Sequence, residues 1–166
     1  LYFVEHVRPN VEQASFALAR KYVECPHRAA LARQRYFVYD RARDMEVRLF
    51  REENLPLKVE EEKLAQQYQK LYGEMTAVLD GRELTLPQLS KLLEEPARDM
   101  RRAAWCAATA RQLREREQIE SIFDRMIELR TRMARNAGYA DFIEFQFANL
   151  GRFDYSPADC LAFHRA

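Results

Sequence analysis

The sequence has few of the residues that break helices or cross-link chains. Its 166 residues include 4 Gly, 6 Pro and 3 Cys. So little Gly and Pro disfavours the repeated tight turns of an all-β sandwich or barrel. The cysteines, Cys25, Cys106 and Cys160, are far apart and form no Cys-x-x-Cys pair, which argues against a disulfide framework or a structural zinc knuckle. A reducing compartment fits this pattern best.

The chain also lacks a long apolar run and a strong excess of charge. No stretch of about 18 apolar residues occurs, and Glu5 and His6 interrupt the start where a secretory signal would be apolar. We therefore expect a cytoplasmic protein with no membrane partner. The arginines at positions 33, 35, 41, 43, 48 and 51 alternate with acidic residues and the net charge is only +1, a pattern typical of a solvated helix face. No nucleic-acid partner is expected.

What the sequence does contain favours a helical fold. Apolar residues make up 48% of the chain and charged residues 32%, which is enough apolar material to form a core and disfavours intrinsic disorder. The length suits one domain of ordinary size. We predict a mostly α fold of long antiparallel helices, with residues 1–166 forming a single helical region.

Apolar residues recur at helical spacing along most of the chain. Asn54-Leu55-Pro56-Leu57 is expected to interrupt this pattern, because Pro56 disfavours helical geometry at the residue before it. Glu60, Glu61 and Glu62 would then fall near the first turn of the next helix, where negative charge suits the helix dipole. The predicted helices are 10–24, 26–53, one after the break at 54–57, 87–95, 97–136, 139–150 and one that begins after Ser156.

The segment from about 97 to 136 is the longest without Gly or Pro. As one helix its ~40 residues would span roughly 60 Å, longer than a small domain is wide, which implies a large partner. Its second half spaces apolar residues by three and four, which predicts the seam of an antiparallel bundle or coiled coil. The residues of this seam are Ile119, Ile122, Met126, Leu129 and Met133.

One β-hairpin is predicted near residues 75–86. Asp80-Gly81 lies between two short apolar-rich runs, and this dipeptide suits a two-residue turn with positive φ at both positions. Because two strands alone are marginal in water, we expect the hairpin to lie against helices or to pair with strands outside this chain.

Two helix ends have clear capping signals. Gly138 suits the left-handed position that closes a helix. Ser156 suits the N-cap of the last helix, with Pro157 at its first position and Asp159 able to close back on the cap.

The residues themselves indicate no active site. Cys160 and His164 are four apart on the last predicted helix, but two ligands without a third do not make a zinc site. A catalytic cysteine would need a base, and His6 and His27 belong to distant elements. The glycines are isolated, so there is no phosphate-binding loop. We predict no catalytic, cofactor-binding or metal-binding residue in this chain.

Four segments, taken in order, carry a resemblance to a known family. They are REENLPL (51–57), MTAVLDGRELTL (75–86), RTRMARNAGY (130–139) and RFDYSPADC (152–160). In combination they resemble the oligoendopeptidase F branch of the thimet oligopeptidase-like zinc metallopeptidases. The resemblance implies the amino-terminal part of a larger, bilobed, helical peptidase whose walls enclose a channel that admits only short peptides.

The catalytic motif of that family is missing from this sequence. It is His-Glu-x-x-His, in which two histidines one helical turn apart hold zinc and the glutamate activates the bound water. Val7, Arg28 and Arg165 follow the three histidines of this chain, where the motif requires Glu. The resemblance therefore implies zinc in the parent enzyme and none in this chain, which we expect to be an inactive fragment without the carboxy-terminal catalytic lobe. The absence of an initiator Met and the abrupt end at Ala166 favour the same expectation.

The sequence also supports a second hypothesis. The heptad-like seam after Ile119 suits partner binding as well as internal packing. The chain would then be a stand-alone helical scaffold or adaptor that binds another helix.

Overall fold

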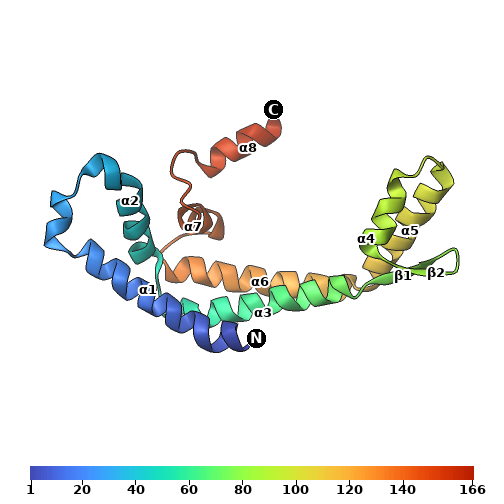
Figure 1. The fold of residues 1–166 in the computed structure, drawn as a ribbon, viewed down its shortest axis with the longest axis horizontal. Coiled ribbons are helices and arrows are strands. Elements are labelled where there is room, and N and C mark those ends of the chain that lie inside the picture. Colours follow the sequence, from blue (N-terminus) through green and yellow to red (C-terminus); the bar gives the residue numbers. More distant parts are fainter. The chain divides into compact units, whose positions relative to one another are not determined.

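A computed structural model describes residues 1–166, and the chain in it is mostly helical with one two-stranded antiparallel sheet (Figure 1). The predicted fold class is confirmed. Short π or 3-10 turns cover Phe3–Val7, Pro26–Ala30 and Leu92–Glu94. The main elements are α1 (Arg8–Val23), α2 (Arg33–Leu49), α3 (Asn54–Gly73), β1 (Thr76–Leu79), β2 (Arg82–Thr85), α4 (Leu86–Lys91), α5 (Arg98–Arg114), α6 (Arg116–Asn136), α7 (Phe142–Asn149) and α8 (Pro157–Arg165).

The tertiary contacts divide the chain into two compact units. The first unit comprises Leu1–Glu61 and Ile127–Ala166, and the second comprises Glu62–Met126. The chain enters the second unit within α3 and leaves it within α6. Each unit therefore contains its own part of these two helices.

The core of the first unit lies where the end of α2, the end of α6 and α7 meet. Its buried residues are Leu49, Ala134, Ala137 and Phe145, with Met45, Tyr139, Phe142 and Ala148 packed against them. Three aromatic side chains, Tyr139, Phe142 and Phe145, thus belong to this cluster. Phe16 of α1 stacks on Phe50, with ring centroids 4.0 Å apart, so α1 is held against the chain just after α2.

The second unit is built around the hairpin, which confirms the strand prediction. β1 pairs with β2 in a register that joins Thr76 to Thr85 and Leu79 to Arg82. Asp80 and Gly81 have φ values of 50° and 75°, as the predicted two-residue turn requires. Figure 1 shows the hairpin beside α4 and α5.

Packing against these helices supports the hairpin, as expected for two strands. The buried residues of this cluster are Met75, Leu86, Leu89 and Ala104. Leu79 and Leu84 of the strands pack against it, so the inner face of the hairpin covers the same apolar surface as α4 and α5.

The prediction of one helix over residues 26–53 is wrong. A 3-10 turn covers Pro26–Ala30, Ala32 is extended, and α2 begins at Arg33 and ends at Leu49. The physical reason is an ion-pair network, because Arg28 folds back to contact Asp40 and Asp44 of α2. A straight helix would carry Arg28 away from both aspartates, and apolar periodicity does not report such a contact.

The prediction of one helix over residues 97–136 is also wrong. The chain turns at Glu115, with φ −98° and ψ 10°, between α5 and α6. Ala104 of α5 and Ile119 of α6 pack on the same cluster of the second unit. In a straight helix these residues would be about 22 Å apart along the axis, too far to reach one small cluster. Tertiary packing thus bends a segment that has no Gly or Pro.

The predicted seam is nevertheless a buried stripe of α6. Ile122, Leu129 and Met133 are almost fully buried, and Ile119 and Met126 are half-buried. The spacing therefore identified the packed face of the helix correctly, although it placed the helix start too early.

A break between two helices is present, but it lies at residues 50–53, four positions before the predicted 54–57. α3 begins at Asn54 and contains Pro56 in its first turn, where the missing N–H has no helical partner to lose. The glutamates at 60, 61 and 62 lie just after the first turn of α3, which itself contains no acidic residue.

Both predicted caps are confirmed. Gly138 has φ 85°, and the N–H of Tyr139 donates to the carbonyl of Ala134 while that of Gly138 donates to Arg135, which closes α6. At α8 the Ser156 hydroxyl accepts from the Asp159 N–H at 3.3 Å, and the Asp159 carboxylate accepts from the Ser156 N–H at 2.7 Å. The Ser156 hydroxyl also donates to the Asp159 carboxylate at 2.7 Å, and this hydrogen bond, followed by that from the Ser156 N–H, lowers the pKa of Asp159.

Candidate functional site

The residues with metal-binding or nucleophilic chemistry are dispersed. His6 lies in the first turn beside Tyr2, His27 lies in the 3-10 turn, and His164 lies in α8. Cys160 shares α8 with His164, as predicted, but no third ligand joins them. No group of three or more His, Cys, Asp or Glu residues in the chain is placed to hold a metal ion.

The start of α3 and the end of α6 are joined by a buried polar knot in the first unit. Asn54 is only 2% exposed, and its side-chain amide donates to the carbonyl of Met133 at 3.0 Å. The Asn136 amide donates to the side-chain carbonyl of Asn54 at 2.7 Å. Arg51 Nε donates to the Asn136 carbonyl at 2.9 Å. The knot thus supplies side-chain donors to two carbonyls in the last turn of α6, those of Met133 and Asn136.

This knot brings together two of the four family-like segments, 51–57 and 130–139. The same two helices are also joined by an ion pair between Arg130 of α6 and Glu61 of α3. Polar residues in these two segments therefore serve to join α3 to α6. The sequence did not reveal the contact, because the partners are 79 and 82 positions apart.

A second polar network holds the 3-10 turn to α1 and α2. Arg28 donates to both carboxylate oxygens of Asp44, at 2.7 and 2.6 Å, and its Nε donates to Asp40 at 2.8 Å. The Tyr22 hydroxyl donates to the same oxygen of Asp40 at 2.7 Å. Sequence reasoning missed this network; the spacing of Asp40 and Asp44 by one helical turn was the available signal.

The network shifts the titration of its members. The hydrogen bond from Tyr22, followed by that from Arg28, lowers the pKa of Asp40. In turn, the hydrogen bond to Asp40 raises the pKa of Tyr22. The two aspartates also raise the pKa of Arg28. These shifts favour an ionised Asp40 and a neutral Tyr22 at neutral pH, which suits a structural clamp.

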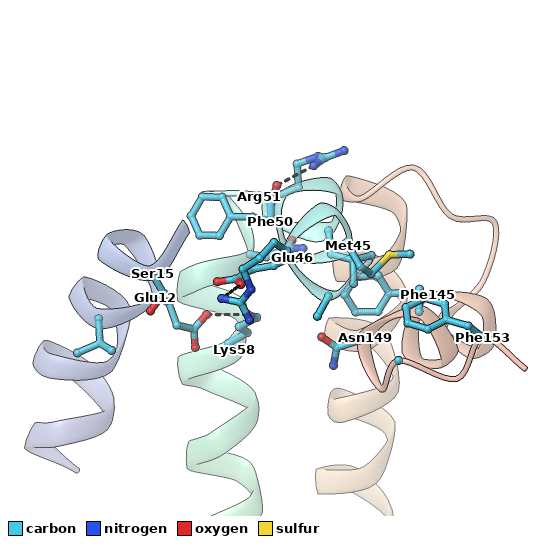
Figure 2. Close-up of a pocket in the computed structure, with 17 residues that line it drawn as sticks. Glu12, Ser15, Met45, Glu46, Phe50, Arg51, Lys58, Phe145, Asn149 and Phe153 are labelled. Atoms are coloured by element: carbon cyan, nitrogen blue, oxygen red, sulfur yellow. Dashed lines mark hydrogen bonds and ion pairs between the residues drawn. The ribbon is translucent and has the colours of Figure 1, made fainter. Parts of the chain in front are cut away.

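A hollow of about 490 Å³ opens in the first unit beside the core (Figure 2). Its apolar wall includes Met45, Leu49, Phe145 and Phe153, and its lining includes no His or Cys.

The charged groups that line this hollow are paired within the chain. Lys58 Nζ lies 2.6 Å from Glu12, and Arg43 lies 2.6 Å from Glu46 (Figure 2). Arg51 donates to the carbonyls of Arg48 and Phe50. The charged groups named here are therefore engaged by partners within the chain.

None of the helices combines the length and the apolar character that crossing a lipid bilayer requires. No protein-family profile matches the chain, and no curated protein matches it.

Solved structures do match the chain. A protein assigned as oligoendopeptidase F from Bacillus anthracis str. Ames gives a TM-score of 0.85 at 25% identity, over 95% of this chain and 29% of that one. Another protein assigned as oligoendopeptidase F, whose X-ray structure was solved at 3.1 Å, gives a TM-score of 0.90 at 28% sequence identity. The match covers 99% of this chain and 29% of that one. Pz peptidase A with an inhibitor gives the same values.

The chain shares the fold of part of the oligoendopeptidase F enzymes. The resemblance inferred from the sequence is confirmed. The chain spans less than a third of the length of these oligoendopeptidase F structures, since the matched share of each is 29%.

Proposed function

We propose that this chain is the amino-terminal helical portion of a zinc-dependent oligoendopeptidase that hydrolyses short peptides. The observation that carries the proposal is the match to oligoendopeptidase F and Pz peptidase structures over 95–99% of this chain but only 29% of theirs. In this proposal the chain contributes to one wall of the substrate channel. The order of the four family-like segments supports the assignment.

Zinc and the catalytic residues are assigned to the rest of the parent enzyme. The three histidines of this chain lie in three separate elements, and none is followed by Glu. The Cys160 and His164 pair offers two ligands, whereas a catalytic zinc site in proteins uses three. The residues of this chain therefore do not fit the metal, and no step of peptide hydrolysis is assigned to them. We propose that the chain by itself is inactive.

The first experiment is to read the coding sequence downstream of Ala166. We expect the frame to continue into a helical region that contains His-Glu-x-x-His. A frame that ends there, or that runs on for a few hundred residues without the motif, contradicts the proposal.

The second experiment uses the purified chain. After dialysis it is expected to retain no stoichiometric zinc and to leave a quenched-fluorescence peptide intact. The longer product of the same frame is the matched control and should cleave that peptide in a chelator-sensitive way. One zinc per chain, together with such cleavage by the short chain, contradicts the assignment of the metal to the missing part.

The adaptor hypothesis depended on a free seam along α6. Ile122, Leu129 and Met133 are at most 5% exposed within the chain itself, so these residues present no open face to another helix. We therefore do not propose an adaptor function for the seam.

A further inference from the structure

The arginines of α2 form a surface that neither the core nor the proposed peptidase function explains. Arg33, Arg41 and Arg48 are spaced by about two turns along one side of this helix. With Arg28 they line a hollow of about 440 Å³ in the first unit. Its remaining lining residues are Phe37, Asp40, Asp44 and Met45.

The acidic residues of this hollow are already occupied. Arg28 holds both oxygens of Asp44 and one oxygen of Asp40, and Tyr22 donates to the same oxygen of Asp40. The hollow thus contains four guanidinium groups and two carboxylates. Arg28 alone binds both carboxylates. The hollow keeps an excess of positive charge.

The other three arginines have no carboxylate partner in the hollow. Arg33 and Arg48 form no ion pair, and Arg48 only stacks over Tyr139. Arg41 lies 3.7 Å from Asp154, which is outside the hollow and 87% exposed, so this contact is weak.

Arg41 is held in place by aromatic rings. Its guanidinium carbon lies 4.2 Å from the ring centroid of Phe153 and 5.2 Å from that of Phe37. Stacking fixes the plane of a guanidinium and leaves the N–H groups at its edge for a ligand. The Nε–H of Arg41 is buried and has no hydrogen-bond acceptor within the chain.

The helix itself adds to the positive field. The first turn of α2 contains no acidic residue and carries Arg33. Because the amino-terminal end of a helix has partial positive charge, a cation there is unfavourable unless an anion accompanies it.

We propose that this hollow binds a carboxylate of an acidic peptide. Planar carboxylates match the bidentate geometry of guanidinium groups. Phe37, which is 49% exposed, and Met45 supply an apolar wall, so the favoured peptide places an apolar side chain next to its acidic residue. The inference concerns binding by this chain alone and does not depend on the proposed peptidase function.

The test is fluorescence anisotropy of a short labelled peptide of alternating Glu and Leu, compared with the same peptide carrying Gln in place of Glu. The intact chain is expected to bind the Glu peptide about tenfold more tightly at low salt, because charged hydrogen bonds to arginine contribute at least this much. The double variant Arg33→Gln/Arg48→Gln should lose this preference. Arg41→Lys, which keeps the charge but not the planar fork, should reduce it.

The matched control is Arg102→Gln/Arg114→Gln, which removes two exposed arginines of α5 in the second unit. This variant should keep the preference for the Glu peptide, and circular dichroism should show the same helicity in all variants. Equal affinity for both peptides, or an equal loss in the α5 control, overturns the proposal. Competition by inorganic phosphate at a lower concentration than acetate, or tighter binding of a single-stranded oligonucleotide, also overturns it in favour of a phosphate ligand.

Discussion

The side-chain amide of Asn54 donates a hydrogen bond to the backbone carbonyl of Met133 across 79 positions of sequence. Asn54 is also the one buried polar residue of the chain. It therefore joins the start of α3 to the end of α6 at a buried point, where water has little access to the hydrogen-bonding groups.

Replacing Asn54 tests how much this contact stabilises the first unit. Asn54→Ala is expected to lower the free energy of unfolding by about 1–3 kcal/mol, because the buried acceptors and donors around it lose their partner. Urea denaturation followed by circular dichroism measures the change. Asn149→Ala, an exposed asparagine of α7, is the matched control and should cost no more than about 0.5 kcal/mol. An equal loss of unfolding free energy in both variants would contradict a stabilising role for the polar knot at Asn54.

The Tyr22 and Asp40 pair predicts a change in stability at acidic pH. The pKa of Asp40 is lowered in the folded chain, so its contribution is complete above the ordinary carboxyl pKa and is lost as pH falls through the lowered value. Tyr22→Phe removes the first cause of this shift and should bring the pKa of Asp40 nearer its usual range. Carboxyl NMR titration of Asp40 in both proteins measures the shift.

Comparison of unfolding midpoints provides a check on that prediction. The difference between the parent chain and Tyr22→Phe should be present at pH 7 and should shrink once the pH falls below the pKa of Asp40. Tyr155→Phe, an exposed tyrosine without a carboxylate partner, is the control and should leave the titration of Asp40 unchanged. An unaltered Asp40 titration in Tyr22→Phe would contradict the proposed cause.

The hairpin turn predicts opposite results for two glycines. Gly81 has φ 75° with open space around it, so Gly81→Ala should cost about 1 kcal/mol from backbone strain alone. Gly73 at the end of α3 has ordinary φ and also has open space, so Gly73→Ala should be neutral or stabilising. Thermal unfolding of the two variants separates these outcomes. If both variants lose the same stability, the turn is not the cause.

The core of the second unit predicts a large loss for one leucine and a small loss for its neighbour. Leu89 is fully buried in the cluster with Met75 and Ala104, so Leu89→Ala should cost about 2–5 kcal/mol. Leu93, which is 40% exposed, lies one turn later, and Leu93→Ala should cost much less. Chemical denaturation gives both values. A loss below about 1 kcal/mol at Leu89 would contradict the assigned core.

Local signals in the sequence predicted the elements that depend on neighbouring residues. Asp80-Gly81 identified the hairpin, Gly138 and Ser156 identified two helix ends, and the spacing of Ile122, Leu129 and Met133 identified the packed face of α6. Each of these features follows from backbone sterics, capping hydrogen bonds or helical periodicity, which act over a few residues. The combination of segments also predicted the family whose fold the chain shares.

Tertiary structure decided the features that depend on distant residues. The turn at Glu115 exists because Ala104 and Ile119 pack on one cluster, and the turn before α2 is held by Arg28 reaching Asp40. Neither turn has a Gly or Pro at its centre, so local residue propensities do not predict either of them. The polar knot at Asn54 and the arginine-lined hollow likewise need helices to meet in space. Periodicity reports which face of a helix is apolar, but it does not report which surface that face will cover or where a helix must bend to reach it.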